Sequence, residues 1–163
     1  MKKGLLTILF VPIFFFASLA QEAKVIKVTD LERMIHSKEE GISVINFWAT
    51  WCKPCVMEMP YFEALNQSSD YPEVTVQFIS VDFVENLESK VKKFIRKKNI
   101  KSEVFLIDNI DYNSWIDKVD KSWSGAIPAT LIIHGQSGKR KFYEKEFKEG
   151  ELEKIVNEFR TSL

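Results

Sequence analysis

The placement of the two cysteines constrains this chain more than any other feature. Cys52 and Cys55 have CxxC spacing and lie directly after the apolar run Ile42–Trp48, ahead of a segment with a helical pattern. A strand that leads into a helix leaves unpaired backbone N–H groups and the positive end of the helix dipole beside Cys52. Both favour the thiolate, the form of cysteine that attacks disulfides. The sequence therefore predicts a redox-active dithiol at the end of a buried strand.

The spacing also predicts a different role for each cysteine. Because two residues separate them, the Cys55 sulfur can reach Cys52 within about one helical turn and close a disulfide without rearranging the fold. We expect Cys52 to attack and Cys55 to resolve. Lys53 and Pro54, which lie between them, tune the pair, and Lys53 should stabilise the thiolate. The Cys52–Cys55 disulfide would be the redox group itself, with no other cofactor.

Metal binding and a structural disulfide are the alternatives for this pair. A structural zinc site needs four ligands, and His36 and His134 are far apart in the sequence. A disulfide across a two-residue loop constrains the unfolded chain little, so it would stabilise little. Two thiolates with His134 would suit copper(I), which makes a copper(I)-binding metallochaperone the alternative function. We predict no resident metal.

The N-terminus has the pattern of a secretory signal. Residues 1–20 contain two lysines, an apolar stretch and small residues at the end, which predicts a cleaved signal peptide and a mature domain over residues 21–163. An uncleaved membrane anchor is the alternative, although the stretch is short for a spanning helix and Pro12 interrupts it. Export to the periplasm or cell envelope would place the dithiol in an oxidising compartment, where a lone CxxC is typical of an exchange site.

The charge balance excludes some partners. The chain has 23 basic and 23 acidic side chains, and removal of the signal would leave a formal charge of about −2. This balance does not indicate binding to nucleic acid or to an anionic membrane surface. The remaining length and the 45% hydrophobic content suit one domain, which we expect to be a monomer.

Apolar periodicity predicts strands that alternate with helices. Strands are expected at 25–28, 42–48, 74–81, 104–107, 129–134 and 140–143, and helices at 30–38, 53–68, 85–98, 112–121 and 151–159. A glycine-containing turn joins the last two strands as a hairpin. This order predicts an α/β sandwich with a mixed sheet and the dithiol at a strand's carboxyl end.

Several motifs resemble a known family. The segment 46–55 (NFWATWCKPC), then Glu58 and Pro60, and later the segment 126–130 (AIPAT) are similar to the exported thioredoxin-like thiol-disulfide oxidoreductases of the TlpA and ResA type. The resemblance covers residues 24–163. It implies a thioredoxin-like three-layer sandwich, with a central mixed β-sheet flanked by helices and a small insertion before the strand that follows the late proline.

The resemblance also implies how a client is bound. Ile127-Pro128 would be a cis peptide facing the dithiol, with an ordinary trans proline as the alternative. A cis proline can end a strand and leave the backbone of the preceding residue free to pair with an incoming peptide. Trp51 and Ile127 would contact the client. Trp123, which lies in the expected insertion, either lines the substrate groove or packs in the core.

Two positions near the dithiol indicate which residue could accept a proton during the exchange. Thioredoxin has a buried aspartate six residues before its first cysteine, whereas this chain has Asn46, which cannot titrate. Glu58, three residues after Cys55, resembles the acidic residue that serves ResA-type proteins. The alternative is that Glu58 is an ordinary surface glutamate on a solvated helix face.

The sequence thus predicts a thiol-disulfide oxidoreductase that acts as a reductant in the cell envelope. Its partners would be client protein thiols or disulfides and an upstream membrane or envelope electron donor. The copper metallochaperone remains the alternative on the same fold, although copper chaperones with this fold generally have a wider CxxxC spacing.

Overall fold

Six strands form one sheet in a computed structural model that describes residues 22–108 and 111–163. The predicted signal segment, residues 1–20, lies outside the described residues. The strands are β1 (Lys24–Ile26), β2 (Ile42–Trp48), β3 (Val74–Ser80), β4 (Glu103–Ile107), β5 (Ala129–His134) and β6 (Arg140–Tyr143). The helices are α1 (Val28–Ile35), α2 (Lys53–Gln67), α3 (Lys92–Lys98), α4 (Ile116–Val119) and α5 (Glu151–Thr161), with single turns η1 (Val84–Asn86), η2 (Leu87–Val91) and η3 (Tyr112–Ser114).

The sheet is mixed, as the sequence predicted. Its strand order is β1-β4-β3-β2-β5-β6. Strands β1, β4, β3 and β2 pair in parallel, whereas β5 pairs antiparallel with β2 and with β6. Every residue of β2 except Ser43 is buried, because helices cover both faces of this inner strand. Burial on both faces explains why the sequence of β2 is an almost continuous apolar run.

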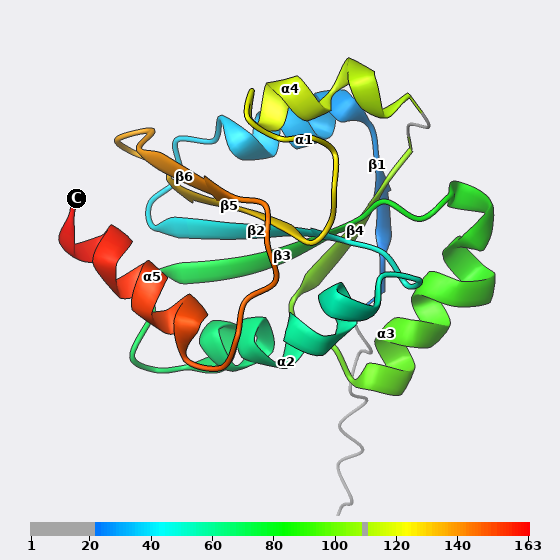
Figure 1. Cartoon of the computed structure of the whole chain (residues 1–163), viewed down its shortest axis with the longest axis horizontal. Helices are drawn as coiled ribbons and strands as arrows, with labels where there is room; N and C mark the ends of the chain where they lie inside the picture. The colour runs from blue at the N-terminus through cyan, green and yellow to red at the C-terminus, as the bar shows by residue number, and fades with distance from the viewer. Residues whose placement is uncertain (1–21, 109–110) are drawn as a thin grey trace, which may run out of the picture.

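Helices form the outer two layers of the sandwich (Figure 1). Helices α1 and α4 cover one face of the sheet, and α2, α3 and α5 cover the other. Contacts join α1 to α4 and α2 to α5 within their layers. The predicted three-layer sandwich is confirmed, and the dithiol lies where β2 ends and α2 begins.

Neighbouring aromatic residues of β2 fill opposite halves of the core, because successive side chains of a strand point to opposite faces. Phe47 packs against Trp115 and Trp123, with ring centroids 6.0 and 4.6 Å apart. Trp48 packs against Phe94, on the other face, at 5.0 Å. Two tryptophans from the predicted insertion thus close the core on the α4 side.

The segment predicted as one helix over 85–98 is more irregular than expected. It begins with the 3-10 turn η1, continues through the π-helical turn η2 and becomes α-helical only in α3. The apolar stripe of the segment does not distinguish these helix types, because each places residues three to five apart on one side. The prediction of a regular α-helix was wrong for its first half.

The first helix begins two residues earlier than the sequence predicted. The helix expected over 30–38 starts at Val28, with Lys27 as its N-cap, and Asp30 lies in the first turn, where it accepts a 2.9 Å hydrogen bond from the Lys27 N–H. In the described ranges, 22–108 and 111–163, none of the helices has the length and apolar content that crossing a membrane requires.

Candidate functional site

The two cysteines form a disulfide at the start of α2. Their Cα atoms are 5.3 Å apart, and Cys52 is the N-cap of the helix. The Cys55 N–H donates to the Cys52 sulfur over 3.3 Å, so a first-turn backbone donor lies beside that sulfur, as expected. Cys52 is 5% exposed and Cys55 is fully buried. The sulfur predicted to attack is therefore the more accessible of the two.

The tuning residues between the cysteines lie in the first turn of α2. Lys53 is exposed and Pro54 is half-buried. Proline is well tolerated at this position, because its missing N–H would have no partner in the helix. The local sequence therefore starts the helix without disturbing the dithiol.

A buried aspartate anchors the loop that leads into the dithiol. Asp82 follows β3 and accepts hydrogen bonds from the Thr50 N–H at 2.8 Å and the Thr50 hydroxyl at 2.6 Å. The Ser80 hydroxyl donates to the same carboxylate over 2.9 Å. Because β2 and β3 are parallel, their carboxyl ends meet here. The sequence reasoning missed Asp82, although an acidic residue directly after an apolar strand beside β2 was the available signal.

Glu58 is fully buried, so the surface-charge alternative is wrong. Its Oε1 accepts from the Asn46 side-chain amide at 2.8 Å, and its Oε2 accepts from the Phe147 N–H at 2.7 Å. Burial raises the pKa of Glu58 to about 7, since removal from water disfavours the charged form more than these two hydrogen bonds favour it. A carboxyl group that gains and loses a proton near neutral pH lies one helical turn beyond Cys55.

Asn46 has an amide that suits both protonation states of Glu58. Its nitrogen donates to Glu58 and also to the Thr130 hydroxyl at 3.1 Å. Its buried Oδ1 has no hydrogen-bond partner among the described residues. The nitrogen serves the ionised carboxylate, and rotation of the amide would offer Oδ1 to a protonated carboxyl. Asn46 cannot titrate, but its amide can form a hydrogen bond with Glu58 whether that carboxyl is ionised or protonated.

The peptide bond Ile127-Pro128 is cis, as the resemblance implied, and a network of hydrogen bonds holds the loop before it. The Trp123 indole N–H donates to the Ala126 carbonyl at 2.8 Å. Glu144 accepts from the Ala126 N–H at 3.1 Å and from both the N–H and the hydroxyl of Ser124. Burial works against ionisation of Glu144, but these hydrogen bonds outweigh it and lower its pKa. Sequence reasoning missed this carboxylate.

The three residues predicted to contact a client line one pocket. Trp51 is 67% exposed, Ile127 is half-buried and Trp123 is 4% exposed. The pocket has a volume of about 210 Å³. One part of the Trp123 ring therefore packs in the core and another lines this pocket, whereas its contact with a client stays a prediction.

The histidines lie outside this arrangement. His36 is exposed at the end of α1, and His134 is paired with the Ser137 hydroxyl in the β5–β6 turn. Within the described parts of the chain, no three His, Cys, Asp or Glu side chains gather as a metal would require.

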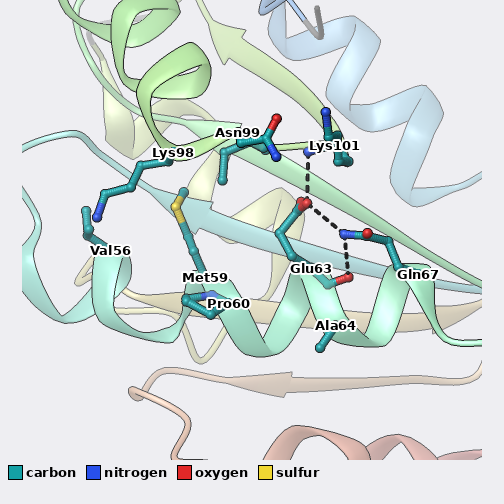
Figure 2. Close-up of a pocket in the computed structure, with 10 residues that line it drawn as sticks. Val56, Met59, Pro60, Glu63, Ala64, Gln67, Lys98, Asn99 and Lys101 are labelled. Carbon is teal, nitrogen blue, oxygen red and sulfur yellow. Dashed lines mark hydrogen bonds between the residues drawn. The ribbon is translucent and has the colours of Figure 1, made fainter. Parts of the chain in front are cut away.

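A larger cavity of about 380 Å³ lies between α2 and the segment that joins α3 to β4. Figure 2 shows Glu63 reaching across it, where its carboxylate accepts from the Lys101 N–H at 2.8 Å and from the Gln67 amide at 3.2 Å. The Ser102 N–H donates to the same carboxylate at 3.0 Å. Glu63 thus joins α2 to the residues just before β4. These hydrogen bonds help to hold α2 in place beside the cavity.

Comparisons with known proteins agree with this geometry. A model of the AhpC/TSA family matches residues 16–138. The thiol-disulfide oxidoreductase ResA of a Bacillus cereus strain is 36% identical over 146 residues, which cover 85% of this chain and 79% of that relative. Alignments with several other Bacillus ResA proteins are shorter and span 50% of those relatives.

Solved structures share the fold at lower identity. A thioredoxin-related protein from Neisseria meningitidis serogroup B superposes with a TM-score of 0.64 and 20% identity, covering 76% of this chain and 87% of the neighbour. StoA from Bacillus subtilis has a TM-score of 0.56 and 18% identity, covering 72% and 84%. Both support the thioredoxin-like arrangement of the mixed sheet and its helices.

Proposed function

Because the chain belongs to the AhpC/TSA family and is a thioredoxin-like thiol-disulfide oxidoreductase related to ResA, we propose that it reduces disulfides of client proteins in the cell envelope. One observation carries the proposal: a Cys52–Cys55 pair at a helix start, with a buried Glu58 one turn away whose pKa is about 7. This arrangement supplies a nucleophile, a resolving thiol and a proton acceptor in one place.

The exchange proceeds in two balanced steps. The Cys52 thiolate attacks a client disulfide, so that a mixed disulfide forms and the first client sulfur leaves as a thiolate. The Cys55 thiolate then attacks the Cys52 sulfur, which releases the second client thiolate and forms the Cys52–Cys55 disulfide. Two electrons pass to the client, and an external dithiol must return two electrons before the next cycle.

Glu58 takes the proton of Cys55 in the second step. Helical residues three apart are neighbours, so the carboxyl lies on the same side of α2 as the resolving thiol. A general base works best when its pKa is near the working pH, and a pKa of about 7 meets that condition. Asn46 supports this role through an amide that suits either state of Glu58.

The loop at Pro128 holds the client beside Cys52. Proline has no N–H, so it ends the pairing of β5 and leaves the Ile127 backbone available to an extended peptide. Trp51 offers exposed aromatic surface next to the attacking sulfur. Client recognition therefore combines backbone pairing with contacts to side chains that flank the dithiol.

The place of action follows from the N-terminal pattern and the chemistry. The signal-like segment 1–20 would direct the domain to the periplasm or envelope. A reductant in an oxidising compartment needs a supply of electrons, which makes an envelope or membrane protein with its own dithiol the partner upstream. We propose a monomer that meets donor and client in turn at the same surface.

The copper(I) alternative has no observation in its favour. The alternative placed His134 beside the two sulfurs, but His134 pairs with Ile42, at the end of β2 opposite the one that leads to Cys52. The described residues contain no cluster of three or more possible metal ligands.

An equilibrium titration against glutathione tests the proposed direction. We expect a reduction potential below about −200 mV, in the range of reducing dithiols, and catalytic reduction of insulin disulfides. Cys52→Ser should abolish the reduction, and Lys53→Ala should retain it. A potential near −120 mV, which is typical of a strong oxidant, would contradict the reductant role.

A further inference from the structure

The pocket beside the dithiol is lined mainly by apolar and aromatic surface. Its walls are Trp51, Val81, Trp115, Trp123, Gly125 and Ile127. None of these six residues has a charged side chain, so an ionised group that entered would lose its hydration without gaining a partner. The lining therefore favours an apolar occupant.

The size of the pocket suits one side chain. Its volume is about 210 Å³. An apolar protein cavity of roughly 150 Å³ is large enough to bind benzene. One aromatic ring or one branched aliphatic side chain therefore fits.

The inner wall is held rigidly before any client arrives. The Trp123 ring packs against Phe47 with centroids 4.6 Å apart and meets Trp115 edge-on at 5.5 Å. Its indole N–H is fixed by the Ala126 carbonyl at 2.8 Å. A preformed pocket binds more tightly because few side chains lose freedom when it is filled.

The outer wall places the pocket next to the reacting sulfurs. Trp51 directly precedes Cys52, and Ile127 directly precedes Pro128. A client whose backbone pairs at Ile127 and whose sulfur meets Cys52 must lie along the edge of the pocket that Trp51 and Ile127 form. An extended strand advances about 3.3 Å per residue, so only residues close to the client cysteine can reach the pocket.

We propose that this pocket selects clients by receiving one aromatic or branched aliphatic side chain located within two residues of the client's reactive cysteine. The inference rests on the proposed function and adds a substrate class to it. Clients with small or charged residues around their cysteine leave the pocket empty and are reduced more slowly.

Symmetric peptide disulfides provide the test. Each substrate is a dimer of one single-cysteine peptide with Ala, Leu, Phe or Asp two residues from the cysteine, so either sulfur can be attacked with the same result. The reduced protein becomes the Cys52–Cys55 disulfide and each dimer yields two peptide thiols, which chromatography quantifies. A methylene in an apolar pocket already changes kcat/KM by about ten-fold, so we expect at least that preference for Phe over Ala.

Two exposed aromatic residues provide a matched pair of variants. Trp51, 67% exposed, lines the pocket, whereas Phe83, 55% exposed, does not. Because both side chains are largely in solvent, Trp51→Ala and Phe83→Ala should fold normally. We expect Trp51→Ala to reduce the Phe/Ala preference to within about three-fold and Phe83→Ala to keep the wild-type preference.

The outcomes separate this inference from the function on which it rests. Equal rates for all four peptides, or a Phe/Ala preference that survives in Trp51→Ala, would overturn the pocket while leaving the reductase intact. Failure of the wild-type protein to reduce any peptide disulfide would overturn the proposed function and the substrate class together.

Discussion

Substitution of Glu58 by Gln should remove a pH dependence of stability that the wild-type protein carries. The buried carboxyl has a pKa of about 7 in the folded protein against 4.5 in the unfolded chain. Between these values the folded state holds a proton that the unfolded state has released. The stability contributed by the neutral carboxyl is complete below pH 4.5 and is lost as the pH rises through 7.

The size of the effect follows from the two pKa values. One pKa unit corresponds to about 1.4 kcal/mol, so the wild-type protein should lose on the order of 3 kcal/mol of unfolding free energy across this window. A glutamine at position 58 has no charge to bury. Its oxygen can accept from the Phe147 N–H, and its nitrogen can donate to the Asn46 Oδ1 after rotation of that amide.

Denaturant unfolding of the oxidised protein at pH 5, 6, 7 and 8 measures the effect, because the disulfide keeps the thiols from titrating. Glu58→Gln should gain about 2–3 kcal/mol relative to the wild type between pH 5 and 8. Glu144 and Glu151 have lowered pKa values, so they weaken the fold below pH 4.5, outside this window.

Glu63→Gln is the matched control on the same helix. It removes a carboxylate that bonds the start of β4 but leaves Glu58 in place, so it should lower stability and keep the wild-type pH dependence. Parallel stability curves for the wild type and Glu58→Gln between pH 5 and 8 would refute the reasoning, because they would mean that Glu58 is not protonated by burial.

Two further predictions concern the dithiol and the loop before the cis-proline. A short iodoacetamide pulse on the reduced protein should label Cys52 ahead of Cys55 in mass mapping, since only the first is accessible; preferential labelling of Cys55 would reverse the assigned roles. Glu144→Ala should lower stability by about 1–2 kcal/mol and raise KM for peptide disulfides several-fold while Cys52 alkylation is unchanged, and Glu149→Ala serves as the exposed control. An unaltered KM in Glu144→Ala would show that this loop does not position the client.

Local patterns predicted the sheet well. The strand over 129–134 has the bounds that were expected, and the run 42–48 is the buried inner strand that its continuous apolar sequence indicated. These predictions hold because burial of a strand on one or both faces leaves a periodicity of its own in the sequence. The turn types in the segment 84–98 leave no such mark, so its first half was predicted incorrectly.

The candidate site was predictable only where it is local. CxxC spacing and its position before a helix revealed Cys52 and Cys55, and they are linked as expected. The buried Glu58 carboxylate accepts a hydrogen bond from the Phe147 N–H, which is 89 residues away in the sequence. No pattern around Glu58 contains that contact, so whether Glu58 is buried or lies on the surface stayed open until the fold was known.

The surroundings of Trp123 were equally impossible to predict from the local sequence. Its sequence position allowed packing in the core or a place in a groove, and the structure sets its ring against Phe47 and in the wall of a pocket whose role is not tested. A single residue type cannot reveal that its two sides face different surroundings. The hydrogen bonds that Glu144 accepts from Ser124 and Ala126 are equally non-local, since they join residues 20 and 18 positions apart.

Trapping of the mixed disulfide tests the central claim most directly. In the proposed mechanism, Cys52 is the attacking residue and Cys55 the resolving one. Reduced Cys55→Ser, incubated with a client peptide whose cysteine is in a disulfide, should therefore accumulate a covalent adduct at Cys52. Under the same conditions Cys52→Ser should form none, because its remaining thiol is fully buried. Equal adducts in both variants, or an adduct only in Cys52→Ser, would contradict the mechanism.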